Sequence, residues 1–474
     1  MIRTVLCNLF FIVIYSQVAY ASNFSERQLQ LVPTHYQMNY QINIKQEDIN
    51  ASAVITLQNI SDKPATHIPL ELYRLLHVDS VTDIAQTPLS FSQQVLVDET
   101  WPAMQTNYVE ISLPEPLAPQ KSYSVKVSFS GKILGYVETG MAYTQDSINE
   151  QFSIIRQDVY AYPIPLYPND DVNRKAKWWL NHFDYDVTVE VPQGYIVANM
   201  GKLISTEQHK ERVAYRYQNK LPAWRMDFAI AKYQKFYKGD VTLYSFEDKQ
   251  FSEQLLNKSN QAVELYRKWF GELDSTSGYT MIEIPKGYGS QADRTGMLIV
   301  ADGFIDHSQI YHEISHQWNV KANELQAPRW NEGLATFLQY FVAEKLDKPG
   351  VLAQETEKSL SYVKRLLTNK PLYSKTTFLD YGKHGLSAYE VGMLFFHLLY
   401  DITGEQDFNK IVGGYYHQYY QSGGTTLQFI NYAKSHSHKD LTQLMQEWAF
   451  SSQYADRILA SPNYNALLAN YLHS

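Results

Sequence analysis

The first half of the chain contains short segments in which apolar and polar residues alternate. Examples are 36–44, 53–57, 123–129, 185–191 and 241–246, and turn residues separate them. Alternation places every second side chain on one face of an extended strand, so it is typical of antiparallel β-structure with one buried face. The pattern therefore predicts a β domain that ends near residue 248.

The pattern changes near Asp248, where apolar residues begin to recur at helical spacing. Segment 251–270 is predicted to be an amphipathic helix, and two apolar, strand-like runs follow it at 279–284 and 297–300. The remainder is predicted to be helical over 305–320, 331–346, 353–367, 387–400, 408–420, 426–434 and 441–450. We therefore predict an α+β multidomain protein with a β domain at 22–248 and a mostly helical domain at 249–474.

The first 21 residues have the features of an export signal. Arg3 supplies a positive start, the stretch 4–18 is mostly apolar, and Ala19-Tyr20-Ala21 offers small residues where a signal peptidase cuts. An uncleaved membrane anchor is the alternative, but the apolar stretch is short for a membrane span. The sequence thus predicts a signal peptide at 1–21 and an exported chain, periplasmic or secreted, without a stable membrane span after cleavage.

The composition excludes several classes of chemistry. The chain has 49 acidic and 41 basic residues, a net charge of −8, so it offers no basic surface for nucleic acid. Its single cysteine, Cys7, lies in the predicted signal, which excludes thiol catalysis and thiolate metal ligands in the mature chain. Nothing in the composition indicates an oligomeric state.

The segment His312-Glu313-Ile314-Ser315-His316 carries the clearest chemistry. Residues four apart lie on one face of a helix, so His312 and His316 can bind the same Zn²⁺. Glu313 lies beside them, where its carboxylate can take a proton from a zinc-bound water. An ordinary helix with two histidines is the alternative, and a third ligand would decide between the two.

Glu332 is the predicted third zinc ligand. It lies at the start of the next predicted helix, and the intervening turn would fold that helix back against the first. Catalytic zinc sites use three protein ligands and leave the fourth position for water. His307 is a competing ligand, but it is five residues before His312 and so lies off the metal-facing stripe.

Two motifs together give a family resemblance. His312-Glu-Ile-Ser-His316-Gln-Trp318 followed by Trp330-Asn-Glu-Gly333 resembles the signature of the M1 family of gluzincin aminopeptidases. Tyr389-Glu-Val-Gly392 resembles a further segment of that family, whose tyrosine stabilises the oxyanion of the tetrahedral intermediate. In the β half, Phe183–Pro192 resembles part of the family's N-terminal saddle.

The resemblance implies a fold, a cofactor and a reaction. The expected fold is an N-terminal antiparallel β saddle or sandwich followed by a thermolysin-like catalytic domain, in a short form without the large C-terminal helical domain. The expected cofactor is one Zn²⁺, the expected catalytic residues are Glu313 and Tyr389, and the expected partners are peptides.

The sequence also departs from the family pattern. The segment between His316 and Glu332 is shorter than usual, and the family's Gly-x-Met-Glu-Asn strand is absent. Alignment of the following strand puts Gln291-Ala292-Asp293 in its place, which makes these three the candidate substrate-binding residues and Asp293 the candidate amine anchor. Asp158 in the β half is a looser candidate for a second carboxylate at the substrate amine.

The sequence predicts zinc-dependent hydrolysis of peptide bonds, and the favoured prediction is an aminopeptidase, which removes N-terminal residues from peptides. An endopeptidase on the same zinc site and an M61-like aminopeptidase, suggested by His316-Gln-Trp-Asn-Val-Lys321, are the alternatives within the enzyme class. A non-catalytic secreted binding protein with a zinc site is the alternative outside it.

Overall fold

A computed structural model describes most of the chain. The described residues are 30–98, 103–168, 183–246, 249–273, 278–293, 296–300, 307–322, 330–370, 373–377 and 388–472. The predicted signal peptide at 1–21, which includes Arg3, lies outside them.

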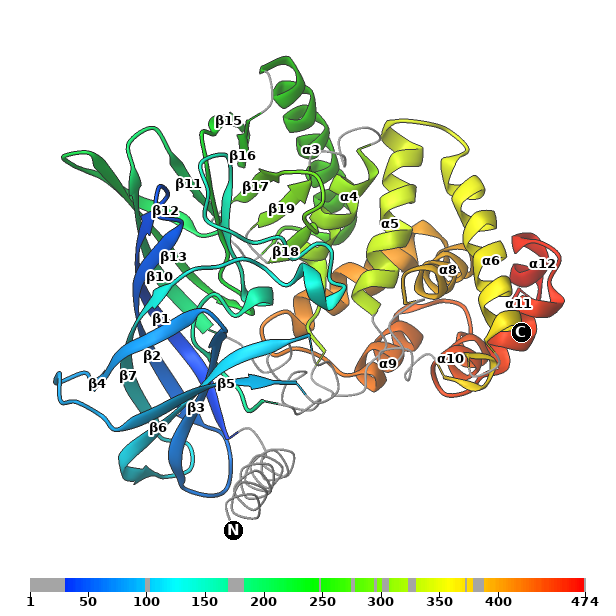
Figure 1. The fold of residues 1–474 in the computed structure, drawn as a ribbon. Coiled ribbons are helices and arrows are strands. Elements are labelled where there is room, and N and C mark those ends of the chain that lie inside the picture. The colour runs from blue at the N-terminus through cyan, green and yellow to red at the C-terminus, as the bar shows by residue number, and fades with distance from the viewer. Residues whose placement is uncertain are drawn as a thin grey trace, which may run out of the picture. The chain divides into compact units, whose positions relative to one another are not determined.

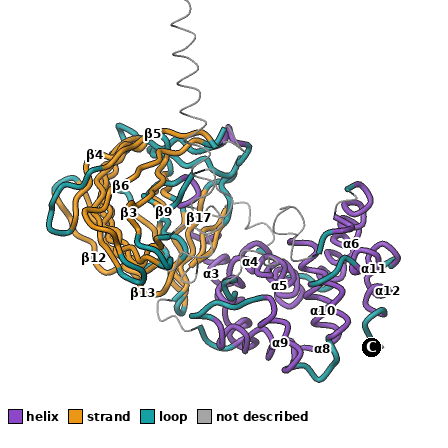
Figure 2. Tube along the Cα trace, turned by 90° about the horizontal axis from the view of Figure 1, so that it is seen from below, coloured by secondary structure: helices purple, strands orange, loops and turns teal. Residues whose placement is uncertain are grey.

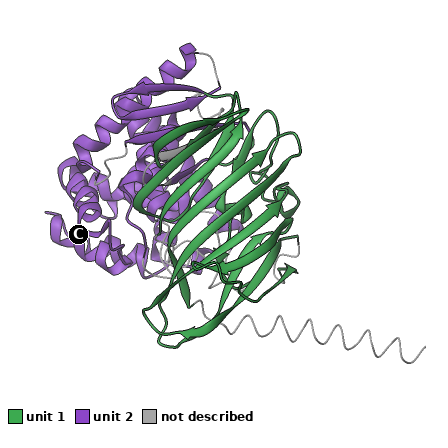
Figure 3. Cartoon of the chain, turned by 90° about the vertical axis from the view of Figure 1, so that its left-hand side faces the viewer, with its two compact units in different colours: residues 1–233, 287–289 green, residues 234–286, 290–474 purple. Residues whose placement is uncertain are grey.

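The chain divides into two compact units (Figure 3). Unit 1 consists of Met1–Tyr233 with Gly287–Gly289, and unit 2 consists of Gln234–Lys286 with Ser290–Ser474. Strands dominate unit 1 and helices dominate unit 2 (Figure 2). The α+β organisation predicted from the sequence is therefore confirmed.

Unit 1 is built from three sheets in its described residues (Figure 1). The seven-stranded sheet has the order β12-β13-β10-β1-β2-β7-β4, and the smaller sheets have the orders β5-β6-β3-β9 and β11-β14-β8. The strands are β1 (Leu31–Asn43), β2 (Asp48–Asn59), β3 (Ala65–Tyr73), β4 (Leu76–Asp83), β5 (Phe91–Val97), β6 (Gln105–Leu117), β7 (Ser122–Gly131), β8 (Ser153–Ile155), β9 (Ile164–Pro165), β10 (Phe183–Pro192), β11 (Ile196–Asn199), β12 (Lys202–His209), β13 (Arg212–Ala223) and β14 (Phe228–Ala231). Two 3₁₀ turns, η1 (Val137–Thr139) and η2 (Gln157–Val159), lie between them in sequence.

The alternating sequence pattern of unit 1 is realised in its large sheet. Along β10, Phe183, Tyr185, Val187 and Val189 are buried while the residues between them are partly exposed. Most neighbouring strands pair antiparallel, but β1 and β10 pair in parallel, in the register Tyr36↔Tyr185. The sequence pattern predicted the buried face but not this parallel pair, because side-chain alternation is the same in both strand directions.

Unit 2 contains one five-stranded sheet and a set of helices in its described residues (Figure 1). The sheet order is β15-β16-β17-β19-β18. Its strands are β15 (Gln234–Lys238), β16 (Val241–Ser245), β17 (Tyr279–Ile284), β18 (Gln291–Asp293) and β19 (Gly296–Val300). The helices are α3 (Lys249–Phe270), α4 (Ser308–Ser315), α5 (Trp330–Leu346), α6 (Val351–Asn369), α8 (Ala388–Tyr419), α9 (Thr426–His436), α10 (Thr442–Ala449), α11 (Gln453–Ala460) and α12 (Tyr464–Ala469), with 3₁₀ turns η4 (His316–Trp318) and η5 (Tyr373–Lys375).

The division between the units falls before β15, whereas the sequence pattern put it after β16, at residue 248. The reason is the pairing of β16, which lies parallel to β17 with Leu243 opposite Met281. Helix α3 connects β16 to β17, so β15 and β16 belong to the sheet of the helical unit. Alternation identifies a strand but does not say which sheet the strand joins.

The two helices predicted at 387–400 and 408–420 both correspond to parts of α8, where the backbone is interrupted by a kink at Gly404. Gly404 has φ 77° and ψ 166°, a conformation that glycine adopts without a Cβ penalty. Within the part of the chain that the structure describes, no helix combines the length and apolar character of a membrane span.

His397 connects four helices inside unit 2. It lies on α8, its Nδ1 is 3.0 Å from Thr356 Oγ1 of α6, and its ring stacks on Tyr464 of α12 at 4.4 Å. The ring of Phe337 on α5 lies 5.5 Å from the ring of His397. Asp401 Oδ2 is 3.5 Å from His397 Nε2, and burial raises the pKa of the Asp401 carboxyl. Burial lowers the pKa of His397 to about 4.

We expect acid to destabilise unit 2 through His397. The folded-state pKa of His397 is below its unfolded value, so protonation of this imidazole favours the unfolded state. The free energy of unfolding is therefore highest above about pH 6.5 and decreases as the pH falls towards 4. A shift of this size corresponds to about 3 kcal/mol. Urea unfolding at pH 7.5 and pH 5 should show a smaller pH dependence in His397→Gln than in the wild type. His209→Gln, an exposed control, should keep the wild-type slope, and an equal slope in His397→Gln would contradict the assignment.

Candidate metal centre

Helix α4 carries the histidine pair. His312 and His316 lie one turn apart, with ring centroids 4.8 Å apart and ring planes at 84°. The helix predicted over 305–320 is α-helical only over Ser308–Ser315 among the described residues, and it continues as the 3₁₀ turn η4. His316 begins that turn with helical backbone angles, so the i, i+4 relation predicted from the sequence is kept.

The end of this helix is fixed by aromatic packing. Trp318, in η4, is 1% exposed and donates from its indole Nε1 to Gly271 O at 3.0 Å. The Tyr266 hydroxyl of α3 donates to Tyr311 O at 2.9 Å, and its ring lies 5.4 Å from that of Trp318. Buried aromatic groups with a satisfied polar atom hold a backbone in one place, so α4 presents its histidines from a rigid support.

Glu332 completes the group from the first turn of α5. Its Oε2 lies 3.4 Å from His312 Nε2 and 3.7 Å from His316 Nε2. In a tetrahedral site with metal–ligand distances near 2.1 Å, neighbouring ligand atoms are about 3.4 Å apart. The three donor atoms are therefore spaced as zinc ligands, although their side chains come from two helices.

The donor set fits a catalytic zinc ion. One ligand atom from each of His312, His316 and Glu332 lies within 4.8 Å of the other two. Among the described residues, these three form the cluster of histidine and carboxylate side chains that could hold a metal ion. The three side chains are 12–16% exposed, so the group is partly open to solvent. Two imidazoles and one carboxylate with an accessible fourth position are characteristic of catalytic rather than structural zinc sites.

The electrostatics of His312 indicate competition between a proton and a metal ion. Burial lowers the pKa of His312, but the hydrogen bond to Glu332 and the charges of Glu313 and Glu332 outweigh it, so the pKa is raised. A ligating imidazole must be neutral, so the raised pKa makes a proton a stronger competitor of the metal ion at this side chain. Glu313 itself is 8% exposed and lies on α4 beside the pair.

Tyr389 approaches the same group from α8. Its ring lies nearly parallel to that of His312, at a centroid distance of 6.2 Å and an interplanar angle of 20°, and the residue is 37% exposed. The structure thus brings Tyr389 near His312, although the two are far apart in sequence.

A close contact between two glycines sets the spacing of α5 and α8. A Cβ added at Gly333 would lie 2.5 Å from Gly392 Cα and 2.9 Å from the Gly392 carbonyl carbon. Gly333 follows Glu332, and Gly392 lies one turn after Tyr389. The absence of a side chain at Gly333 therefore lets the Glu332 and Tyr389 segments approach each other at backbone contact.

Gly333→Ala is expected to destabilise the protein by about 1–3 kcal/mol, because overpacking forces the two backbones apart. The sign is informative, since glycine to alanine inside a helix otherwise stabilises by about 0.5–1 kcal/mol. Urea unfolding measures the change, and zinc affinity should fall as Glu332 moves. Gln354→Ala, on the exposed face of α6, serves as the control and should be neutral or stabilising. Stabilisation by Gly333→Ala would contradict this account.

The predicted substrate-binding segment forms an edge strand. Gln291, Ala292 and Asp293 make up β18, which pairs antiparallel with β19 in the register Ala292↔Met297 and is the last strand of its sheet. Gln291 is partly exposed and Ala292 is buried. The side chain of Asp293 lies outside the described part of the structure, so the amine-anchor assignment stays a prediction.

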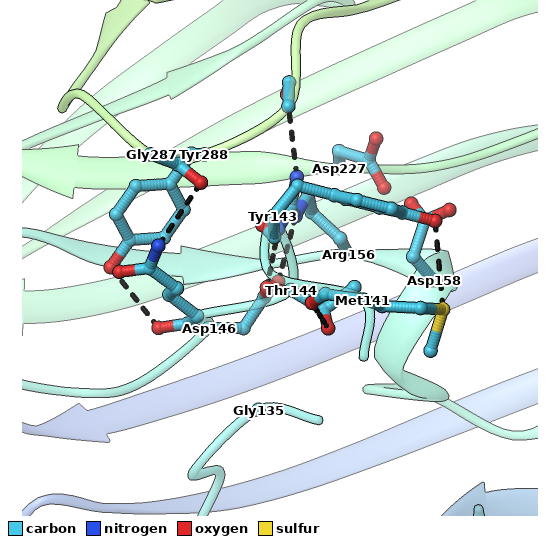
Figure 4. Close-up of polar contacts among 12 residues, drawn as sticks. Gly135, Met141, Tyr143, Thr144, Asp146, Arg156, Asp158, Asp227, Gly287 and Tyr288 are labelled. Carbon is cyan, nitrogen blue, oxygen red and sulfur yellow. Dashed lines mark hydrogen bonds and ion pairs between the residues drawn. The ribbon is translucent and has the colours of Figure 1, made fainter. Parts of the chain in front are cut away.

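The competing zinc ligand His307 and the second candidate for the substrate amine, Asp158, each have other partners. His307, the competing ligand, caps α4 with a left-handed backbone, and its Nδ1 lies 4.0 Å from Asp347 Oδ1. Asp158 in unit 1 forms a buried ion pair with Arg225, which also pairs with Asp227. Near it, Arg156 donates to Asp146 Oδ1 at 2.8 Å and to Tyr143 O at 2.9 Å (Figure 4).

Two residues around the histidines escaped the sequence analysis. Gln339 Oε1 lies 3.2 Å from His312 Nδ1, and an amide nitrogen of Asn319 is placed 2.5 Å from His316 Nδ1. Their sequence signal is weak: Gln339 is two turns after Glu332 on α5, and Asn319 directly follows η4.

The sequence matches two family descriptions that together cover more than half of the chain. Residues 306–448 match the peptidase family M1 domain, and residues 32–156 match the peptidase M1 N-terminal domain. The chain therefore belongs to peptidase family M1, and it is a zinc peptidase. The family resemblance seen in the motifs is confirmed. A search of curated proteins gave no match.

Solved structures show the same fold at low sequence identity. An M1 zinc metallopeptidase from Deinococcus radiodurans, as a variant bound to a Tyr-Ser-Ala substrate, is 15% identical with a TM-score of 0.65, over 89% of this chain and 94% of that chain. A two-domain M1 zinc metallopeptidase variant bound to L-arginine is 16% identical with a TM-score of 0.64, over 91% of this chain and 94% of that chain. These matches confirm the predicted order of a β-rich half followed by a mostly helical half.

Proposed function

We propose that the protein is an aminopeptidase that removes N-terminal residues from peptides outside the cytoplasm. The observation that carries the proposal is the convergence of His312, His316 and Glu332 on one point, with Tyr389 alongside. A binding protein would need the three ligands but would have no use for a general base and an oxyanion donor beside them.

In this proposal the residues have separate roles. His312, His316 and Glu332 would hold one Zn²⁺, which would supply a water of lowered pKa and polarise the scissile carbonyl. Glu313 accepts the proton of the attacking water and delivers it to the leaving amine. The Tyr389 hydroxyl donates a hydrogen bond to the developing oxyanion.

The preference for a free N-terminus rests on three supports. The motifs resemble those of aminopeptidases, and β18 offers an edge along which a short peptide can add as a strand. Relatives of the same fold have been solved with L-arginine and with L-tryptophan, and single amino acids are what an exopeptidase releases. Asp293, at the end of β18, is the proposed anchor for the substrate amine.

Export is proposed from the sequence of the first 21 residues. Cleavage after Ala21 would give a mature chain that begins at Ser22. N-terminal sequencing of protein recovered outside the cytoplasm tests this, and an intact Met1 there would contradict it.

The function is tested with a pool of peptides, each supplied with a free and with an acetylated N-terminus. The purified mature chain is assayed with zinc and with a zinc chelator. We expect loss of single N-terminal residues from the free peptides only, abolished by the chelator and restored by zinc. Asp293→Asn should then raise KM for free peptides.

Two other outcomes would replace the proposal. Internal cleavage of free and acetylated peptides alike would make the protein an endopeptidase and remove the amine-anchor role of Asp293. No cleavage by zinc-loaded protein would favour the binding-protein alternative.

A further inference from the structure

Each imidazole of the metal centre has its second ring nitrogen against a neutral amide side chain. The Nε2 atoms of His312 and His316 face Glu332, while their Nδ1 atoms face Gln339 and Asn319. Gln339 comes from α5, the helix that carries Glu332, and Asn319 comes from the end of η4.

With the Gln339 amide in the orientation that the structure gives it, the contact at His312 requires the proton on Nδ1. An imidazole that offers the Nε2 lone pair to a metal ion carries its proton on Nδ1, which then donates a hydrogen bond. Gln339 Oε1 is the atom that faces Nδ1, so it accepts this bond at 3.2 Å. The other end of the amide donates from Nε2 to Ser308 Oγ at 3.0 Å, and Ser308 is 5% exposed. Both ends of the Gln339 amide therefore have partners in the orientation that a metal-ready His312 requires.

Ser308 also explains why the contact is rigid. It lies one turn before His312 on α4, so Gln339 reaches across from α5 and contacts two successive turns of the metal-binding helix. A long side chain held at both ends loses its rotamer freedom on folding rather than on metal binding.

At His316 the same requirement fixes the orientation of Asn319. The structure places the amide nitrogen of Asn319 2.5 Å from His316 Nδ1. Once Nδ1 is protonated, both nitrogens are hydrogen-bond donors and neither can accept from the other. Amide oxygen and nitrogen positions are interchangeable by a flip of the side chain. In the flipped orientation Oδ1 accepts from Nδ1–H, and Asn319 plays the part at His316 that Gln339 plays at His312.

We propose that Gln339 and Asn319 are positioning residues that hold His312 and His316 as Nδ1-protonated tautomers and thereby set the zinc affinity of the site. The proposal rests on the zinc-ligand assignment of the proposed function. Because both partners are neutral amides, they orient the imidazoles without adding negative charge, whereas a carboxylate at either position would make the imidazole a stronger donor to the metal.

The test is the zinc dissociation constant of the full mature chain, measured by competition with a chromophoric chelator and without any peptide. Gln339→Leu keeps the size of the side chain but removes the acceptor, and we expect it to weaken zinc binding about 10–100-fold. Gln339→Glu retains an acceptor, so its affinity should equal or exceed that of the wild type. Gln354→Leu, at an exposed position of α6, is the matched control and should bind zinc as the wild type does.

Asn319 is tested in the same way. Asn319→Asp can only accept from Nδ1–H, so it should keep zinc, while Asn319→Leu should lose affinity. A dissociation constant within twofold of the wild type in Gln339→Leu would overturn the proposal, since a purely structural role would change stability and not zinc affinity. If the leucine variants do not fold, a tenfold weakening in Gln339→Glu overturns it equally.

The zinc measurement separates this proposal from the proposed function. Tight zinc binding that depends on Gln339, in a protein that removes no N-terminal residue from any peptide, would support the positioning role and refute the proposed aminopeptidase function. A wild-type chain that binds no zinc would refute the ligand set and the positioning role together.

Discussion

Replacement of Glu313 by glutamine is expected to reduce peptide hydrolysis about 10³-fold, within the range that general acid–base catalysis contributes. Glutamine has the shape of glutamate but cannot accept a proton at neutral pH. The zinc ligands are other residues, so the zinc content should remain that of the wild type. The measurement is kcat/KM on a free peptide, together with metal analysis of the same sample.

A matched control separates the loss of a proton acceptor from a general effect of removing a carboxylate. Glu264 lies on α3 with a side chain that is 61% exposed, and Glu264→Gln should retain full activity. If Glu313→Gln retains a tenth or more of the wild-type kcat/KM, Glu313 is not the base, and the proton must go to another group.

Tyr389→Phe is expected to lower kcat by about 10²–10³-fold, the usual effect of removing one oxyanion donor. The change deletes only the hydroxyl and leaves the ring that lies along His312 at 6.2 Å. Because the donor acts on charge that develops in the transition state, KM and zinc affinity should change little. Steady-state kinetics over a range of peptide concentrations separates the two parameters.

Tyr237→Phe is the control for this substitution, since that tyrosine is 63% exposed on β15. A variant at Tyr389 with wild-type kcat would show that the oxyanion is stabilised elsewhere. A rise in KM with unchanged kcat would instead make Tyr389 a substrate-binding residue.

The parts of the site that follow from local geometry were predictable from the sequence. His312 and His316 are one helical turn apart, so their convergence needs only that α4 be helical at that point. Glu332 required a second step, the return of α5 against α4, which the turn between the two predicted helices indicated and the family resemblance then supported. The distances of 3.4 and 3.7 Å between Glu332 and the imidazoles are consistent with that step.

The parts that depend on tertiary contact were not predictable. Gln339 acquires its role because α5 packs beside Ser308, and nothing in the spacing of polar residues along α5 indicates which of them meets a histidine. Gly333 is part of a recognisable motif, but its backbone contact with Gly392 exists only in the folded pair of helices. The alternating segment 241–246, which forms β16, was recognised as a strand but assigned to the other half, because pairing partners are not encoded in alternation.

The short segment Gly287–Gly289 has a consequence for how the protein can be divided. It lies between β17 and β18 in sequence, both of which belong to unit 2, yet it is part of unit 1. There, Tyr288 packs edge-on against Phe152 at 5.2 Å and donates to Gln145 O. A cut after Tyr233 would therefore release an N-terminal fragment that lacks three of its own residues, and with them an aromatic contact. The two units cannot be separated by a single cut, because the chain passes from unit 1 to unit 2, returns to unit 1 at Gly287–Gly289 and then re-enters unit 2.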